Sequence, residues 1–148
     1  MRKIIYNKFD KHDITALPKV LFSGRIIVIN TAAEAEKAVD YLMSQKILGI
    51  DTETRPSFKK GQTHNVALLQ VSTHDTCFLF RLNLTGITPA IIRLLEDPSI
   101  PKIGLSLRDD INSLHKRADF HPGNFIDLQK HVCELGVEDL SLQKLYAN

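Results

Sequence analysis

The stretch Ile47-Leu48-Gly49-Ile50-Asp51-Thr52-Glu53-Thr54 decides the fold. An apolar run with β-branched residues is typical of a buried strand, and this run ends in two carboxylates one residue apart. Because residues i and i+2 of a strand point to the same face, Asp51 and Glu53 are expected to project side by side. Neighbouring carboxylates repel, and hard divalent cations such as Mg²⁺ and Mn²⁺ relieve that repulsion. The stretch predicts a strand with a metal site at its end, although a strand that runs into a polar turn has the same pattern.

The composition is that of one globular domain. The 148 residues are 43% hydrophobic and 24% charged, close to globular averages. No apolar run approaches the roughly 20 residues of a membrane span, and the N-terminus becomes charged before a signal-peptide core could form. We therefore expect a cytoplasmic protein with no membrane partner. Cys77 and Cys133 lack the spacing of a metal knuckle or a disulfide framework, so we expect buried free thiols.

The elements expected along the chain begin with an arm. Residues 1–24 show no sustained hydrophobic period and are expected to lie over a domain without forming an element of their own. A short buried strand at 25–30 precedes a helix that Thr31 and Glu34 begin as a capping box. After the strand that carries the acids, the pattern predicts strands at 66–72 and 76–81, a helix at 87–95, a strand at 100–104, a helix at 106–116, a strand at 125–127, a helix at 128–135 and another from 140.

This order of elements predicts an α/β fold with a mixed sheet flanked by helices. Short connections should pair three consecutive strands as an antiparallel meander that includes the acid-bearing strand. The later strands arrive through helices and should lie parallel to that central strand. This topology would place Asp51 and Glu53 beside the start of the helix that contains Asp109 and Asp110.

Three segments in a fixed order resemble the ribonuclease D and Werner-type 3′–5′ exonucleases, the DEDD exonucleases of the ribonuclease H-like fold. The segments are Leu48–Thr54, Val66–Val71 and Lys102–Ile111. Asp51 and Glu53 match the first family motif. Asp110 matches the second, because it lies six residues after Gly104 and directly before an apolar residue. Segments at 127–129 and 140–145 also resemble the family, so the likeness covers roughly residues 25–146.

The resemblance implies a ribonuclease H-like fold and metal-dependent hydrolysis of terminal phosphodiester bonds. It implies two divalent cations, Mg or Mn, with Asp51 binding both, Glu53 binding the ion that holds the water and Asp110 serving the other. Asp109 is assigned to the cap of the helix at 106–116. The implied partner is nucleic acid with a single-stranded 3′ end, DNA or RNA. A formal net charge of +2 neither requires nor opposes such a partner.

The family pattern also has a fourth acid, in a Tyr-x-x-x-Asp or His-x-x-x-Asp motif on a helix beyond the Leu-Ser-Leu segment at 140–142. The chain stops at Asn148, before such a helix. We therefore expect residues 25–148 to be an exonuclease-like domain truncated before its last catalytic helix, C-terminally incomplete and weak or inactive. Apolar surface left uncovered could pair two copies of the chain. A naturally degenerate protein is the alternative.

Contacts to the substrate are expected from the polar loop at 55–64. Arg55, Lys59 and Lys60 could hold phosphates, and Phe58 could stack on terminal bases or wedge between them. A solvated charged loop with its phenylalanine packed on the core has the same sequence pattern.

Two other functions share this pattern. A non-catalytic nucleic-acid-binding or scaffold module could keep the fold without the chemistry, and the sequence beyond Asn148 would distinguish it from an enzyme. A different ribonuclease H-like nuclease is disfavoured by the meander and by the segment at 66–70. DNA and RNA substrates both remain open, because nothing identifies a residue that reads the 2′-hydroxyl.

Overall fold

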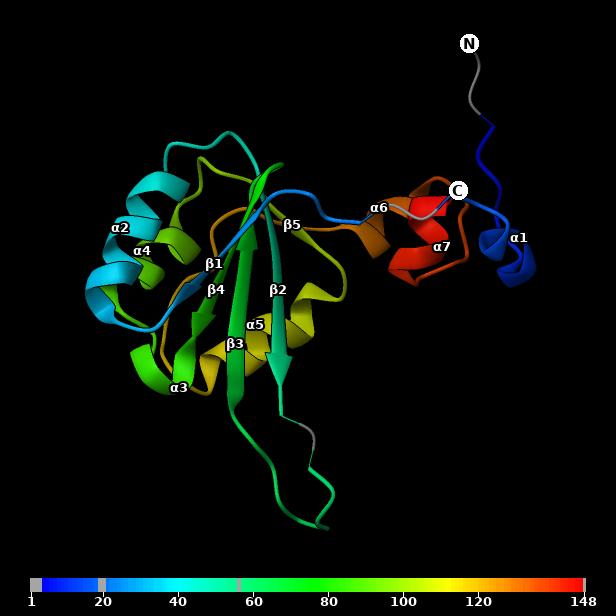
Figure 1. Ribbon diagram of the computed structural model, residues 1–148. Coiled ribbons are helices and arrows are strands. Elements are labelled where there is room, and N and C mark those ends of the chain that lie inside the picture. The colour runs from blue at the N-terminus through cyan, green and yellow to red at the C-terminus, as the bar shows by residue number, and fades with distance from the viewer. Residues whose placement is uncertain (1–3, 19–20, 56, 148) are drawn as a thin grey trace.

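The computed structural model describes residues 4–18, 21–55 and 57–147, and its centre is a six-stranded mixed sheet (Figure 1). The strand order across the sheet is β1-β4-β3-β2-β5-β6. The strands are β1 Arg25–Ile29, β2 Leu48–Thr54, β3 Val66–Ser72, β4 Thr76–Arg81, β5 Lys102–Gly104 and β6 Phe125–Asp127. The acid-bearing strand β2 therefore lies inside the sheet, between β3 and β5.

The middle of the sheet is the predicted antiparallel meander, which is confirmed. β2 pairs with β3 so that Ile50 is opposite Val71, and β3 pairs with β4 so that Val71 is opposite Phe78. Directly opposed residues project to the same face of a sheet. All three of these side chains are buried, so they mark the face on which the core lies.

The remaining strands join in parallel. β5 pairs in parallel with β2 and β6 with β5, which confirms the expectation for strands reached through helices. β1 pairs in parallel with β4 at the other edge of the sheet. The strand expected at 25–30 is present as β1, but the expectation that it is buried is wrong, because Ile26 is 61% exposed and Val28 is 44% exposed. An edge strand has a neighbour on one side alone, so apolar residues there need not be covered.

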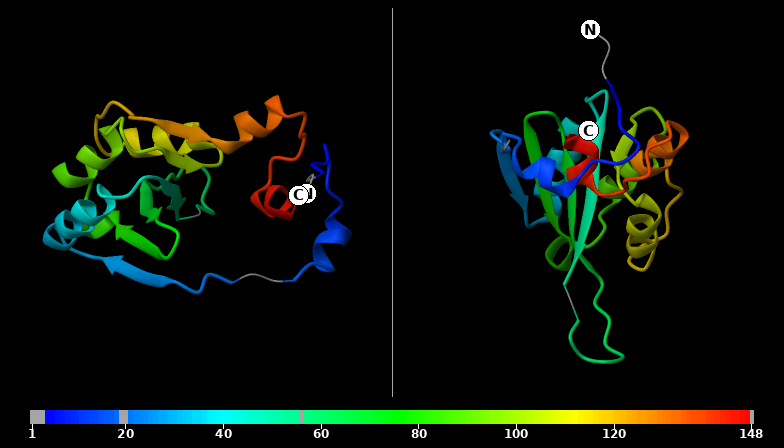
Figure 2. Two further views of the ribbon diagram at one scale, coloured as in Figure 1. Left: turned by 90° about the horizontal axis from the view of Figure 1, so that it is seen from above. Right: turned by 90° about the vertical axis from the view of Figure 1, so that its right-hand side faces the viewer.

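The helices α2 Ala32–Leu42, α4 Pro89–Glu96 and α5 Leu107–His115 also contribute buried residues to the core. The left view of Figure 2 shows α4 and α5 on one side of the strands. The predicted capping box of α2 is confirmed: the Thr31 hydroxyl accepts from the Glu34 amide at 3.1 Å and donates to Glu34 Oε1 at 3.0 Å. Within the described residues, no helix has the length and apolar character needed to cross a membrane.

Two shorter helices complete this part of the fold. α3 Leu82–Thr85, which was not predicted, follows β4 directly, and α6 Leu128–Glu134 follows β6. Cys133 on α6 is exposed and Cys77 on β4 is half-buried, so the expectation of two buried thiols is wrong. The reason is the position of α6, none of whose side chains is fully buried.

The N-terminal arm carries a short helix and contacts the last helix. α1 Lys11–Thr15 lies beside α7 Leu142–Ala147, to the right of the sheet in Figure 1. Ahead of α1, the Phe9 amide donates to Asp139 Oδ2 at 2.6 Å, and the Asp139 side chain is nearly buried. The expectation of an arm without an element of its own is therefore wrong, since the arm forms α1 and packs near α7.

A buried ammonium group ties together the loops at the start of β5. Lys102 has no exposed surface, and its Nζ donates to the carbonyls of Asp97 at 2.6 Å, Ile100 at 2.9 Å and Gly123 at 2.6 Å. The same atom lies 5.4 Å from the centre of the Phe125 ring. Burial lowers the pKa of Lys102, and the nearby Asp97 carboxylate opposes that shift. All three ammonium donors are used, so the group is costly to bury but costlier to remove.

Lys102→Met should lower the free energy of unfolding by about 2–4 kcal/mol, because three buried carbonyls lose their donor. Urea unfolding followed by circular dichroism measures this difference. Lys116→Met is the matched control, since Lys116 is exposed and should change stability by less than about 0.5 kcal/mol. Equal stability of the two variants would show that the three hydrogen bonds contribute nothing.

Candidate functional site

The two carboxylates of β2 lie on the face of the strand opposite the core. Ile50 is buried, whereas Asp51 and Glu53 are exposed and alternate with half-buried Thr52. The Thr52 amide donates to Asp51 Oδ1 at 2.9 Å, and the pairing of β2 with β3 shifts register between Glu53 and Thr54. The regular part of the strand therefore ends where the acids lie.

Asp110 reaches the same strand from α5. It lies in the first turn of that helix and accepts a hydrogen bond from the Thr52 hydroxyl. Burial raises the pKa of the Asp110 carboxyl, the Thr52 hydrogen bond opposes the shift, and the charges of Asp51 and Asp109 raise the pKa further. Asp110 and Asp51 are thus close enough for their charges to interact, and a cation beside them would relieve the repulsion.

The structure brings Asp110 to β2 without gathering the three predicted acids into one cage. Thr52 contacts Asp110, and the alternation of a strand sends Asp51 and Glu53 to the other side. Across residues 4–18, 21–55 and 57–147, no group of three or more His, Cys, Asp or Glu side chains is placed to hold a metal ion. The chemistry of the donors fits a divalent cation, because carboxylate oxygens suit Mg²⁺ and Mn²⁺. Burial is the main reason that the pKa of Asp110 is raised, and the charge of Asp51 adds to the shift.

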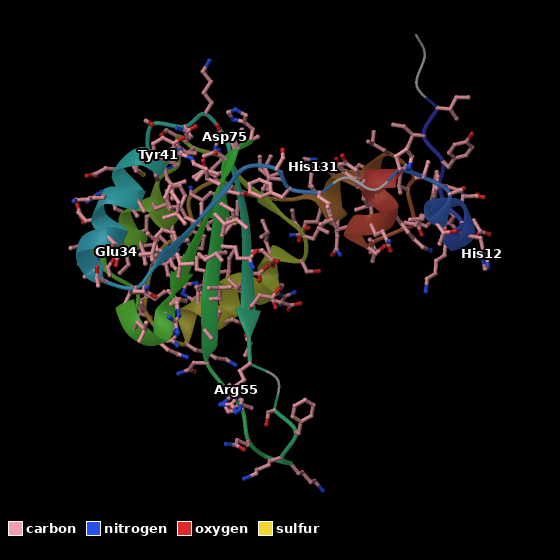
Figure 3. The ribbon with its side chains drawn as sticks, in the orientation of Figure 1. His12, Glu34, Tyr41, Arg55, Asp75 and His131 are labelled. Atoms are coloured by element: carbon pink, nitrogen blue, oxygen red, sulfur yellow. The ribbon has the colours of Figure 1, made fainter. Side chains whose placement is uncertain are left out.

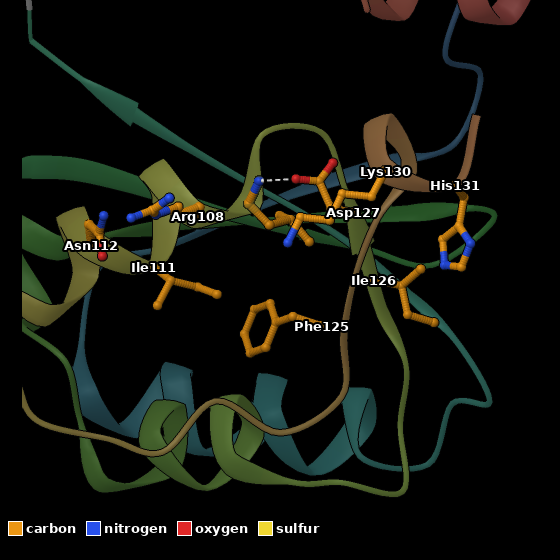
Figure 4. Close-up of a pocket in the computed structure, with 9 residues that line it drawn as sticks. Arg108, Ile111, Asn112, Phe125, Ile126, Asp127, Lys130 and His131 are labelled. Carbon is orange, nitrogen blue, oxygen red and sulfur yellow. Dashed lines mark hydrogen bonds between the residues drawn. The ribbon is translucent and has the colours of Figure 1, made fainter. Parts of the chain in front are cut away.

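Asp127 fixes the start of α5, and the sequence did not single it out as a site residue. Its carboxylate accepts from the amides of Ser106 at 3.2 Å and Leu107 at 3.1 Å, and the second of these bonds is drawn in Figure 4. It also accepts from the Gln129 amide at 3.0 Å, so one side chain caps both α5 and α6. The expectation that Asp109 caps α5 is wrong. Asp109 lies in the first turn of α5 and is exposed, and Asp127 supplies the cap. An aspartate between a strand and a helix signals the local cap of α6, not the cap of α5.

A groove of about 380 Å³ lies between α5 and β6 (Figure 4). Its basic side chains are Arg108, Lys130 and His131, and its apolar side chains include Ile111. The one carboxylate in its described wall, Asp127, is already used as a cap. The groove is therefore not a second acid site.

The predicted nucleic-acid contacts lie on a loop that extends past the end of the meander (Figure 3). Lys59 and Lys60 are exposed, and Phe58 is 95% exposed. The interpretation in which Phe58 packs the loop on the core is wrong, because the ring has almost no cover. Arg55 lies at the base of the loop, directly after β2 (Figure 3).

Residues 26–148 match a protein-family model described as 3′–5′ exonuclease. A curated 3′–5′ exonuclease of Arabidopsis thaliana is 30% identical over 105 residues, which is 63% of this chain and 36% of that protein. The bifunctional 3′–5′ exonuclease/ATP-dependent helicase WRN of Mus musculus is 28% identical over 118 residues, 76% of this chain and 8% of WRN. The chain therefore spans about a third or less of the curated relatives that it matches.

Solved structures share the fold. The EXD2 exonuclease domain soaked in Mg and GMP gives a TM-score of 0.62 at 23% identity, covering 75% of this chain and 60% of that one. Trypanosoma brucei RNase D in complex with RNA U12 gives 0.61 at 23% identity, covering 73% and 39%. At this identity the likeness establishes the fold, and the predicted ribonuclease H-like α/β architecture is confirmed.

Asp110→Asn should stabilise the protein at pH 7 in EDTA. A carboxyl whose pKa is raised by folding binds its proton more tightly in the folded state, so stability falls as pH rises from the ordinary value of 3.8 through the raised value. Asparagine keeps an acceptor for Thr52 without the charge. The gain should reach at most about 1 kcal/mol, because the carboxyl is half exposed and screened.

Urea unfolding of both proteins between pH 4 and pH 7 measures this gain, which should shrink toward zero as pH approaches 3.8. Asp109→Asn is the control, since that neighbour is exposed and its replacement should change stability by less than about 0.5 kcal/mol. A gain for Asp110→Asn that is constant over this range would show that the charge is not its source.

Proposed function

The chain belongs to the 3′–5′ exonuclease family, and from that premise we propose that Asp51, Glu53 and Asp110 act together in hydrolysing the terminal phosphodiester bond of a nucleic acid. The contact between Thr52 and Asp110 carries the proposal. It holds the acid of the second family motif against the strand that bears both acids of the first. A water oxygen attacks phosphorus, and the bond from phosphorus to the 3′ oxygen breaks. The terminal nucleotide leaves as a nucleoside 5′-monophosphate, and the 3′ oxygen takes up a proton, so that the shortened strand ends in a 3′-hydroxyl.

Divalent cations, two of Mg or Mn, are part of this proposal. When bound, they stabilise the negative charge that develops on the phosphate oxygens during an in-line displacement. Asp51 would contribute to both ions, Glu53 to the one nearer the attacking water and Asp110 to the other. The repulsion between Asp51 and Asp110 supports this assignment, because it is the kind of strain that a bound cation removes.

The proposed substrate is a single strand with a free 3′ end, DNA or RNA. Arg55, Lys59 and Lys60 would contact its phosphates, and Phe58, whose ring is exposed, would stack on a base. The solved relatives support this choice, since one was soaked with GMP and the other was bound to RNA U12. We further propose that residues 25–148 form the exonuclease-like domain and that residues 1–24 form an arm. The proposal includes a cytoplasmic location and pairing of two copies of the chain.

Mn²⁺ should raise the melting temperature of the protein, and Asp51→Asn should remove most of that rise. Binding to the folded state stabilises it in proportion to the logarithm of free ligand over Kd, so the shift reports affinity without any activity. Asp109→Asn, the neighbouring acid not proposed as a ligand, should keep the rise.

The same three proteins are then given 5′-labelled single strands with Mn²⁺. We expect the unchanged protein to shorten these strands from the 3′ end. Asp51→Asn should slow it at least about 100-fold and Asp109→Asn less than about threefold. Binding of strands without hydrolysis by any of them would favour the non-catalytic module instead.

Lys59→Gln combined with Lys60→Gln should weaken binding of single strands of any sequence. Each phosphate contact that is lost reduces the slope of log affinity against log salt by about 0.7, so the pair should reduce it by about 1.4. Fluorescence anisotropy at four salt concentrations in EDTA measures the slope. The control replaces Lys37 and Lys46, which are equally exposed but lie on α2 and just before β2. Equal slopes for the two double variants would show that the loop lysines are merely solvated.

A further inference from the structure

A polar cleft opens at the base of the loop, next to the end of the acid-bearing strand. Its volume is about 460 Å³, and its wall is mostly polar. The polar residues that line it come from four segments of the chain: Arg55, Thr63, His64, Asn65, Asn83 and Arg117. Among the described lining residues there is no carboxylate, so the cleft is a basic pocket beside an acidic strand.

Arg117 gives this cleft a fixed positive charge. Its Nε donates to the Val66 carbonyl at 2.7 Å, Nη2 donates to Asn83 Oδ1 at 2.6 Å, and Nη1 donates to the Leu82 carbonyl at 3.4 Å. These three acceptors are neutral, so they hold the guanidinium in place without cancelling its charge. A guanidinium has five N–H groups, which leaves donors for a ligand.

The other basic groups of the cleft are also uncompensated. In the part of the chain that the structure describes, Arg55, His64 and Arg117 take part in no ion pair. A half-buried, rigidly held guanidinium next to a second arginine is suited to bind a phosphate, because charge-assisted hydrogen bonds to phosphate are about twice as strong as neutral ones. The side-chain amides of Asn65 and Asn83 add neutral donors.

The cleft lies where a strand bound at the acids would pass. Arg55 is two residues beyond Glu53, which in an extended chain is about 7 Å. We propose that this cleft binds one phosphate of the substrate strand, near the phosphate that is cut, and so fixes the register of the strand against the acids. This proposal rests on the proposed exonuclease function, but it can fail independently of it.

Asn83→Asp is the sharpest test, because aspartate has the same shape and still accepts the hydrogen bond from Arg117. It adds one negative charge opposite the Arg117 guanidinium, so the fold should be kept while the net positive charge of the cleft falls by one. Asn30→Asp is the matched control, since Asn30 Oδ1 accepts from Arg81 Nη1 at 3.2 Å in the same kind of pair outside the cleft.

Anisotropy with a 5′-labelled single strand in EDTA should show about 3- to 10-fold weaker binding for Asn83→Asp and a salt slope reduced by about 0.7, with Asn30→Asp within about twofold of the unchanged protein. The melting temperature of Asn83→Asp should not fall below that of the unchanged protein. Equal affinities of the two variants would overturn the proposal that the cleft binds the strand. The proposed role of the acids is tested separately by Asp51→Asn and would not be affected.

A second arm uses inorganic phosphate as the probe. If phosphate alone stabilises the unchanged protein more than Asn83→Asp, and the strand binds both equally, the cleft takes free phosphate and the strand proposal is overturned. If the strand discriminates between Asn83→Asp and Asn30→Asp while no protein hydrolyses it, the cleft stands and the exonuclease function fails.

Discussion

The two-residue period of β2 is the constraint on which the rest of the structure depends. Ile50 and Thr52 face the helices, so Asp51 and Glu53 must face the other way. The same period lets α5 approach, because Thr52 meets Asp110 at that face. The approach also needs Gly104, where a Cβ would lie 2.6 Å from the Ile50 carbonyl oxygen and 2.5 Å from the Leu107 side chain. A slip of one residue in β2 would bury both acids and turn Ile50 outward.

What the sequence predicts well is local, and what it misses is made by contacts between distant residues. The meander, the capping box of α2 and the position of Asp110 follow from short spacings, and the structure has all three. Asp127 caps α5 through a hydrogen bond to Ser106, which lies about twenty residues earlier in the chain. No local sequence pattern predicts a contact over that separation. A lysine is normally expected at the surface, so the sequence does not predict the burial of Lys102. Its burial depends on the loops that supply the three carbonyls to which it donates. The apolar run of β1 predicts a buried strand, but the run does not indicate that β1 lies at the edge of the sheet.

Opposite charges are arranged in sequence along β2 and its extension. The acids lie at the end of the strand, Arg55 follows, and Arg117 reaches the same place from the end of α5. Arg117 is held by neutral partners, so its field is not cancelled locally. The small net charge of +2 therefore includes a local separation of charge, with acids at the end of β2 and basic groups in the cleft beside it.

The acids at the end of β2 help to distinguish the two proposed functions, an exonuclease and a module that only binds nucleic acid. Asp110 is a cost to the folded protein, because burial and the nearby Asp51 both disfavour its charge. The same acids repel the phosphates that the neighbouring basic groups attract. In a module that only binds nucleic acid, these acids would therefore lower the affinity for the strand. In the proposed function, divalent cations bound by the three acids would reverse the sign of the site and stabilise the charge that hydrolysis creates. A carboxyl whose charge the fold disfavours is more typical of a catalytic site than of a binding surface, which agrees with the proposed exonuclease function.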